Sequence, residues 1–507
     1  MAEKPLYGGE LVVAMLNTPV HFNPAIQSGM ATGLIGAQLF ATPLRFDENW
    51  NPQPYLAEKW EIATDGLAVT LHLVKGATFH DGRPITSKDI EFSIMTVREH
   101  HPFKSMFASV SKVETPDPQT AIIRLSKPTP AIFLSMSSVL LPIIPKHIYG
   151  DGRDIRTHPA NLAPVGSGPF KFVEYVPGKH VILERYQNYF VKGRPYLDKI
   201  TYRFFRQADV EVPISMETGD CHILPYAEKG SDLKMAARQD NLVITGKGYK
   251  GIGSLFWLAF NLKKKPFDDL RVRQAIAHSI DRDFIVQTLY QGVGKKTTGP
   301  ISPDSPFYSD DVEHYDVDVK RANELLDAAG YPRGQDGVRF KATIDFVVGV
   351  NTYLPLTEYL RHDLMKKIGV ELTVRTSKTL SEWGDTVSHG RFDITIDNVF
   401  NWGDPTIGVH RTYDCNNIRP GVIWSNTQGY CNPKVNQLME AAGSEMNFSK
   451  RKALYAEFQK LVVHDLPVFF ISKPFIATIY HKNLAGIEDN IWGVLSPLDQ
   501  VYWIKKP

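Results

Sequence analysis

The sequence has few cysteines, no long apolar run and no excess of charge of one sign. Only 3 of its 507 residues are cysteine, which excludes a disulfide-held scaffold. No apolar stretch approaches the ~20 residues that a membrane-spanning helix needs. Lysine and arginine number 57 against 55 aspartates and glutamates, so the net charge of +2 creates no general attraction for nucleic acid or an anionic membrane. Partners must therefore be recognised at local sites, and we expect no nucleic-acid partner.

Motifs for catalysis, metal binding and nucleotide binding are also missing. The sequence contains no His-Glu-x-x-His, no Cys-x-x-Cys and no Gly-x-Ser-x-Gly. The glycines of 246–251 have a dinucleotide-type spacing, but strand-like sequence follows where a helix should begin. The 16 histidines are scattered without a compact ligand spacing. We therefore expect no cofactor, no metal site and no catalytic residue.

What the sequence does contain is a large apolar fraction in alternating helix and strand patterns. With 43% apolar and 22% charged residues, the chain can bury a large core and should divide into two or three domains. Apolar clustering predicts strands at 9–16, 180–186 and 253–262. A helix is predicted at 319–332, and helix-then-strand order at 354–376 and 450–472. This alternation favours an α/β architecture.

Five segments, in order, resemble one family of transport proteins. The longest is YLAEKWEIATDGLAVTLHLVKGATFHDGRPITSKDIEFSI at 55–94, whose matching positions are Ala57, Glu58, Trp60, Asp65, Gly66, Phe79, Asp81, Gly82, Thr86 and Asp89. The others are VGSGPFKFVEY at 165–175, FNLKKKPFDDLRVRQAIAHSIDRDFI at 260–285, ANELLDAAGY at 322–331 and YCNPKVNQLMEAA at 430–442. Together they resemble the extracellular solute-binding family that includes the oligopeptide-, dipeptide-, nickel- and opine-binding proteins of ABC importers.

The resemblance implies an α/β, two-lobed periplasmic-binding-protein fold of type II, in the large cluster with an extra subdomain. By analogy, lobe I comprises 1–40, 165–255 and 480–507, an inserted subdomain comprises 41–164, and lobe II comprises 256–479. The strands near 250–262 and 472–485 would form the hinge. Such a protein acts as a monomer, closes around a small-molecule solute, passes it to a membrane permease and performs no chemistry.

The same resemblance implies a periplasmic protein whose signal peptide has been removed. The start MAEKPLYGG has no signal-type apolar region, although a cytosolic protein would begin in the same way. In an exported chain, Cys415 and Cys431 are close enough in sequence for one loop-closing disulfide, and Cys221 is expected to be a buried thiol. Three reduced, inert thiols are the alternative.

The segment NWGDPTIGVHRTYDC at 401–415 contains the main candidates for solute contact. By the resemblance, it crosses the second lobe at the cleft. Trp402 offers an apolar face, Arg411 a planar fork of donors for a carboxylate, and Asp404 an acceptor. Each has a structural alternative: Trp402 as core, Arg411 paired with Asp414, and Asp404 in a turn before its proline.

Weaker candidates lie outside this segment. Met30 and His21 fall in the loop after the first strand, which by the resemblance lines the other wall of the cleft. Trp257 and Trp492 are expected near the hinge and the cleft mouth, with burial in the core as an equal alternative.

The expected solute follows from one departure from the family pattern. Peptide-binding relatives carry an aspartate four residues before the proline of Gly-Asp-Pro, where it holds the α-ammonium of the ligand; here the residue is Asn401. A neutral amide cannot balance a cation in a closed site. An opine-like sugar–amino acid conjugate or a glycoside would suit Asn398, Asn401, Trp402 and Arg411 better. The alternatives are a peptide, if Asp404 takes over the lost role, a metal chelate and, more distantly, an unrecognised soluble hydrolase.

Overall fold

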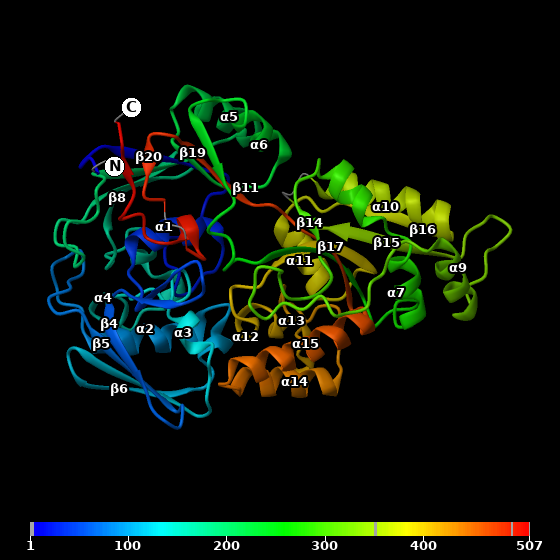
Figure 1. Ribbon diagram of the computed structural model, residues 1–507, viewed down its shortest axis with the longest axis horizontal. Helices are drawn as coiled ribbons and strands as arrows, with labels where there is room; N and C mark the ends of the chain where they lie inside the picture. Colours follow the sequence, from blue (N-terminus) through cyan, green and yellow to red (C-terminus); the bar gives the residue numbers. More distant parts are fainter. Residues whose placement is uncertain (1–4, 349–351, 488–489, 506–507) are drawn as a thin grey trace. The chain divides into compact units, whose positions relative to one another are not determined.

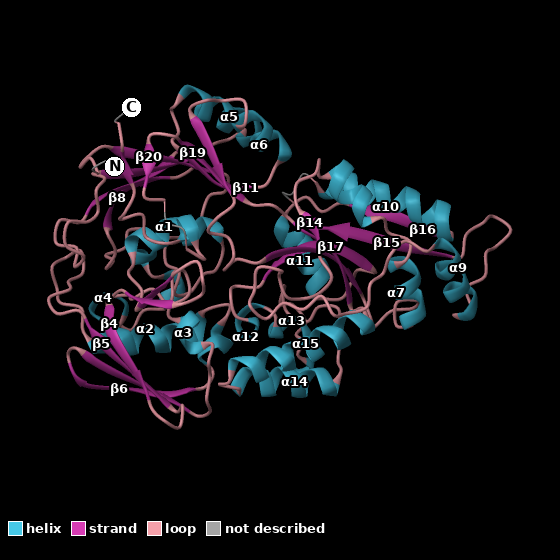
Figure 2. Ribbon diagram, viewed as in Figure 1, coloured by secondary structure: helices cyan, strands magenta, loops and turns pink. Residues whose placement is uncertain are grey.

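A computed structural model describes residues 5–348, 352–487 and 490–505, and it divides the chain into two compact units. Unit 1 is Met1–Gly251 with Ile476–Pro507, and unit 2 is Ile252–Phe475. The chain therefore passes between the units twice, after Gly251 and after Phe475. The lobe boundaries predicted from the sequence put these two crossings at 255/256 and 479/480. Each unit has its own sheets and helices (Figure 2), which confirms the α/β class.

Unit 1 is built on a seven-stranded sheet of order β12-β19-β11-β1-β10-β9-β8. Strands β8, β11 and β19 of this sheet are labelled in Figure 1. Strand β1 lies parallel to β10 and β11, whereas the other pairs are antiparallel. The strands are β1 (Glu10–Met15), β8 (Phe170–Val176), β9 (His180–Arg185), β10 (Lys199–Phe204), β11 (Ile223–Ala227), β12 (Leu242–Thr245) and β19 (Ala477–His481). The helices of this part are α1 (Met30–Leu39), α5 (Ala208–Thr218) and α6 (Gly230–Ala236).

The segment between α1 and β8 forms a second sheet of order β4-β5-β7-β6. Its elements are β4 (Ala57–Ile62), β5 (Ala68–Leu73), α2 (Ser87–His100), β6 (Val110–Asp117), β7 (Thr120–Leu125), α3 (Ile132–Ser135) and α4 (Lys146–Tyr149). Two small ladders join β2 (Leu44–Phe46) to β3 (Pro52–Pro54), and β20 (Leu484–Ala485) to β21 (Tyr502–Trp503). Short 3-10 turns occupy Lys104–Phe107, Ile155–Thr157, Pro159–Asn161 and Gly493–Leu495.

Unit 2 is built on a six-stranded sheet of order β14-β18-β13-β17-β15-β16. Its strands are β13 (Ser254–Phe260), β14 (Lys295–Lys296), β15 (Phe340–Phe346), β16 (Val370–Arg375), β17 (Ile394–Phe400) and β18 (Val468–Lys473). Its helices are α7 (Leu270–Ala277), α8 (Arg282–Phe284) with a π-turn at Ile285–Leu289, α9 (Val319–Ala328), α10 (Tyr353–Ile368), α11 (Leu380–Ser388), α12 (Pro405–Gly408), α13 (His410–Tyr413), α14 (Pro433–Ser444) and α15 (Phe448–Asp465), with a 3-10 turn at Cys415–Asn417. Helices α14 and α15 lie side by side (Figure 1).

Local sequence signals account for several of these boundaries. The Asp269 carboxylate accepts a hydrogen bond from the Arg271 N–H (2.9 Å) and begins α7. Gly369, at φ 70°, ends α10 in the left-handed conformation that glycine adopts without strain. Asp65 and Gly66 turn the chain between β4 and β5, and Asp81 and Gly82 lie in a second turn, which is closed by an isolated bridge between Thr78 and Pro84 and by the hydrogen bond from the Phe79 N–H to the Arg83 carbonyl (2.8 Å).

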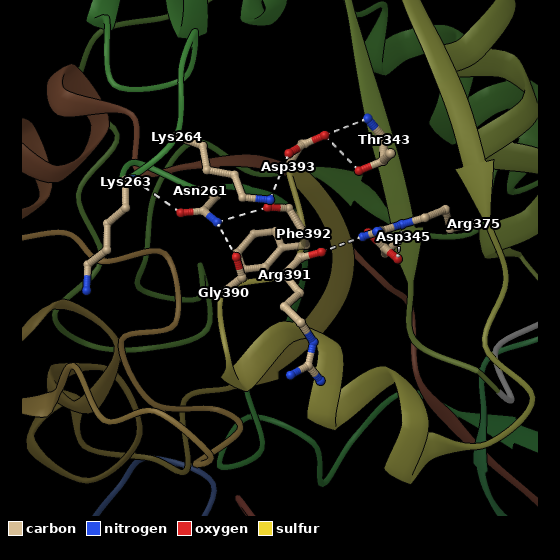
Figure 3. A network of polar contacts seen from close by, with 10 residues as sticks. All are labelled: Asn261, Lys263, Lys264, Thr343, Asp345, Arg375, Gly390, Arg391, Phe392 and Asp393. Carbon is tan, nitrogen blue, oxygen red and sulfur yellow. Dashed lines mark hydrogen bonds and ion pairs between the residues drawn. The ribbon is translucent and has the colours of Figure 1, made fainter.

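A polar network fixes the start of β17 against the neighbouring strands (Figure 3). One oxygen of Asp393 accepts hydrogen bonds from the N–H (2.9 Å) and hydroxyl (2.8 Å) of Thr343 on β15, and the other lies 3.1 Å from Lys264 Nζ. Asn261 Nδ2, just after β13, donates to the Phe392 carbonyl (2.9 Å). Burial alone would raise the pKa of Asp393, but the Thr343 hydrogen bonds and Lys264 lower it below the ordinary value.

We predict that Asp393→Asn lowers the melting temperature at pH 7, since it removes charge-assisted bonds together worth about 1–3 kcal/mol. Because the pKa is depressed in the folded state, this contribution is present above the unfolded value of about 3.9 and is lost as the pH falls through the folded value. Thermal melts from pH 7 to pH 3 should show the difference shrinking in acid. Asp283→Asn, which breaks an exposed pair with Lys296, serves as the control and should change little. An equal loss for both variants would contradict the role of Asp393.

Candidate functional site

The segment that the sequence singled out begins where β17 ends. Strand β17 lies between β13 and β15, is parallel to β15, and leads at its carboxyl end into α12 and α13. Ligands of open α/β sheets characteristically bind outside the carboxyl ends of parallel strands. The segment 397–424, which we call the β17 loop region, is therefore the place in unit 2 to examine for a solute.

Asp404 is held inside unit 2 by a buried ion pair. Its two carboxylate oxygens accept hydrogen bonds from Arg451 Nη1 (2.7 Å) and Nη2 (2.8 Å), and one of them also accepts from the Thr406 N–H (2.9 Å) to begin α12. Asp404 is 6% exposed and Arg451 4%. Burial alone would raise the pKa of Asp404, but Arg451 holds it below the ordinary value. The structural alternative that the sequence left open for Asp404 is therefore favoured, because both of its oxygens have partners inside the fold.

Asn401 and Trp402 also have contacts inside unit 2. Asn401 Oδ1 accepts from the Ser302 N–H (2.6 Å), and its Nδ2 donates to the Pro300 carbonyl (3.2 Å). Trp402 is 4% exposed, adopts a left-handed backbone at φ 49°, and packs edge-on against Phe400 with 5.7 Å between ring centres. The structural alternative that the sequence left open for Trp402 is therefore favoured, and the amide of Asn401, expected to face a solute, instead fixes the loop at 300–302.

Arg411 remains as the charged candidate, and the structure adds a carboxyl that the sequence analysis missed. Arg411, on α13, is half-buried and donates from Nε to the Gly408 carbonyl (3.1 Å). Burial lowers the pKa of Arg411 to about 10, and Asp397 on β17 opposes that change. Asp397 is 4% exposed; its oxygens accept from Trp424 Nε1 (2.9 Å) and the Asn398 N–H (2.7 Å). Burial raises the pKa of Asp397 to about 7, against these hydrogen bonds and Arg411.

Two further candidates lie beside Asp397. Trp257 on β13 is directly opposite Asp397 in the antiparallel ladder, so the two side chains share one face of the sheet. Trp257 is 6% exposed, and its buried Nε1 has no hydrogen-bond partner among the residues that the structure describes. Asn398 is half-buried. The structure therefore brings Arg411 and Trp257 near Asp397, whereas the side chain of Asn398, the next residue along β17, lies on the opposite face of the sheet.

The candidates in unit 1 have mostly structural contacts. Trp492 is 1% exposed and donates from Nε1 to the Ser137 hydroxyl (3.0 Å), so the core alternative is favoured for it. His21 is 8% exposed, its Nδ1 accepts from the Asn23 N–H (3.1 Å), and burial lowers its pKa, which keeps the ring neutral. Met30 is half-buried at the start of α1.

A disulfide closes part of the β17 loop region. Cys415 and Cys431 are bonded, with 4.6 Å between their Cα atoms, which is the pairing that their spacing suggested. The closed loop contains Trp424. Cys221 is a buried free thiol, as expected. Among the described residues, no group of three or more His, Cys, Asp or Glu side chains is arranged to hold a metal ion, and no helix is both long and apolar enough to cross a membrane.

We predict that Asp404→Asn and Arg451→Met each lower the melting temperature. The first change leaves the buried guanidinium of Arg451 without its counter-charge, and the second leaves the buried carboxylate of Asp404 without its counter-charge, at a cost of about 3–5 kcal/mol in each case. The double variant should lose less than the sum of the two single losses, since the second change removes a charge that the first left unpaired. Thermal melts of the four proteins measure this coupling. Strictly additive losses would contradict a direct ion pair.

Comparisons with known proteins agree with this organisation. The chain is 29% identical to the heme-binding protein A of Haemophilus influenzae, covering 90% of this chain and 85% of that protein. It is 28% identical to the oligopeptide-binding protein AppA of Bacillus subtilis, covering 96% and 90%. The structure of AppA with a nonapeptide superposes with a TM-score of 0.84 at 26% identity, covering 99% of this chain and 100% of that one. AgaA with agropinic acid, from A. tumefaciens R10, shares the fold with a TM-score of 0.82 at 24% identity, covering 98% and 99%.

The family profile that matches covers residues 51–420, which is most of the chain, and describes bacterial extracellular solute-binding proteins, family 5. Members of this family bind solutes for ABC importers and are not enzymes, so the recognition made from the five sequence segments is confirmed. The chain belongs to family 5 of the bacterial extracellular solute-binding proteins.

Proposed function

We propose that this protein captures a small, polar, carboxylate-bearing solute in the periplasm and delivers it to the permease of an ABC importer. The observation that carries the solute class is Arg411, a half-buried guanidinium in the β17 loop region next to a buried carboxyl. A guanidinium with a planar fork of donors is the side chain best suited to bind a carboxylate. Closure of the two units around the solute, as a single chain, is the mode of action that the family resemblance implies.

An opine-like solute is favoured over an unmodified peptide by the contacts of two residues. A free peptide brings an α-ammonium, which needs a counter-charge in a site with little water. Asn401 provides none, and both oxygens of Asp404 already accept hydrogen bonds from Arg451. An opine-like sugar–amino acid conjugate instead presents a carboxylate, which Arg411 can bind, and brings no α-ammonium that needs a counter-charge.

A peptide is the second candidate, supported by the relatives. AppA of Bacillus subtilis, 28% identical over most of both chains, is an oligopeptide-binding protein. In this chain the counter-charge for a peptide ammonium would have to come from a residue other than Asn401 and Asp404.

A panel of solutes distinguishes these candidates. We expect agropinic acid to raise the melting temperature, because a ligand at 100 times its Kd stabilises the folded state by about 2.7 kcal/mol. The dipeptide Met-Leu and a nonapeptide should give smaller shifts. Titration calorimetry then gives each Kd. Submicromolar binding of either unmodified peptide would contradict the opine-like class.

We predict that Arg411→Ala weakens binding of the solute found by this panel about 10- to 100-fold, which corresponds to the ~1.5–3 kcal/mol of a charge-assisted hydrogen bond. Arg419→Ala is the matched control, since Arg419 lies in the same region and is exposed. Calorimetry and thermal melts of both variants are required. Unchanged affinity with a lowered melting temperature would assign Arg411 to the fold.

A further inference from the structure

Trp424 combines an anchored end with an exposed ring. Its Nε1 donates to Oδ2 of the buried Asp397 (2.9 Å), and its ring lies 6.4 Å from that of the fully buried Trp383 on α11. Yet 37% of Trp424 remains exposed. An indole at a protein surface is most stable when its apolar ring is buried and its N–H lies near water. Here the N–H is directed inward to a carboxyl, and part of the ring faces outward.

The backbone of Trp424 indicates that this orientation is imposed by its surroundings. Its φ is 52°, a left-handed conformation that side-chain-bearing residues rarely adopt outside constrained sites. Strained residues persist only where neighbouring contacts determine them, and they concentrate at ligand-binding sites.

The loop around Trp424 is held at several points. Asn426, fully buried, donates from Nδ2 to the carbonyls of Asp414 (3.0 Å) and Tyr430 (2.6 Å). The Gly421 N–H donates to the Ser388 carbonyl on α11 (3.1 Å), and the disulfide between Cys415 and Cys431 closes the loop. An aromatic side chain on so fixed a loop loses little conformational entropy when a ligand packs on it.

We propose that Trp424 is an aromatic contact of the solute site and that Asp397 is its positioning residue. The carboxyl of Asp397 accepts a hydrogen bond from the Trp424 indole (2.9 Å), and it also interacts electrostatically with the Arg411 guanidinium. The solute that this arrangement takes has a flat, weakly polar face, such as a sugar or lactam ring, close to a carboxylate. The ring face packs on the indole while the carboxylate pairs with Arg411. This inference rests on the proposed function and specifies its solute further.

The test compares Trp424→Ala, Trp424→Phe and Asp397→Leu with wild type, using agropinic acid, Met-Leu and the nonapeptide as probes. We expect Trp424→Ala to weaken agropinic acid binding tenfold or more, and Trp424→Phe, which keeps a ring, about threefold. Asp397→Leu should behave like Trp424→Ala, whereas Asp397→Asn, which keeps an acceptor for the indole, should bind nearly as wild type. Phe284→Ala is the control, since Phe284 on α8 is also an exposed aromatic (39%) and packs on Tyr359 of α10.

A second readout keeps the test valid where the alanine or leucine variant does not fold. Agropinic acid should change the tryptophan fluorescence of wild type, and most of this change should be absent from Trp424→Phe. A full fluorescence change in Trp424→Phe, or Trp424→Ala binding within twofold of wild type, would overturn the aromatic contact while leaving the proposed function intact. If Trp424→Ala binds the solute with wild-type affinity but no longer supports uptake in cells, the exposed ring is a permease-docking surface and not a solute contact. Failure of wild type to bind agropinic acid would overturn the opine-like class and this inference together.

Discussion

The buried ion pair between Asp404 and Arg451 is the interaction on which the β17 loop region depends. It joins the turn after β17 to α15, 47 residues later in the chain, and supplies the capping acceptor with which α12 begins. Two buried charges are tolerated inside a protein only when they are paired and hydrogen-bonded, and here each carboxylate oxygen receives at least one donor. With the turn fixed in this way, α13 follows directly and places Arg411 close to Asp397.

Other contacts fix the part of the β17 loop region that contains Trp424. The disulfide and the Asn426 hydrogen bonds hold the segment that contains Trp424, while the Asn401 amide holds the loop at 300–302. Rigid support of this kind lets a binding site keep its geometry without a solute, so that little of the binding free energy is spent on ordering side chains.

Much of the fold could be predicted from local sequence. Helices such as α9, α10 and α15 carry apolar residues at helical spacing and end at recognisable residues, and the strands β13 and β16 read as clustered or alternating apolar runs. The family followed from five ordered segments, which consist mainly of turn and core residues. Those segments specify the scaffold because backbone geometry and core packing limit which residues fit there.

The site was less predictable, because the role of each of its residues depends on contacts with residues that are distant in the sequence. Asp404 looks like an available acceptor until Arg451 is seen opposite it, and Asn401 looks like a ligand contact until its amide is found on Ser302 and Pro300. Asp397 did carry a signal, since it interrupts the apolar strand 394–400 at a position that faces inward. Nothing in its own stretch of sequence marked Trp424, because its role depends on Asp397, 27 residues earlier.

A crystal structure of the protein with the solute that it retains through native purification would test the proposed site most directly. We expect a solute with its carboxylate on Arg411 and a ring face on Trp424, while Asp404 remains paired with Arg451. A solute bound without contact to either Arg411 or Trp424, or with its ammonium on Asp404, would contradict it.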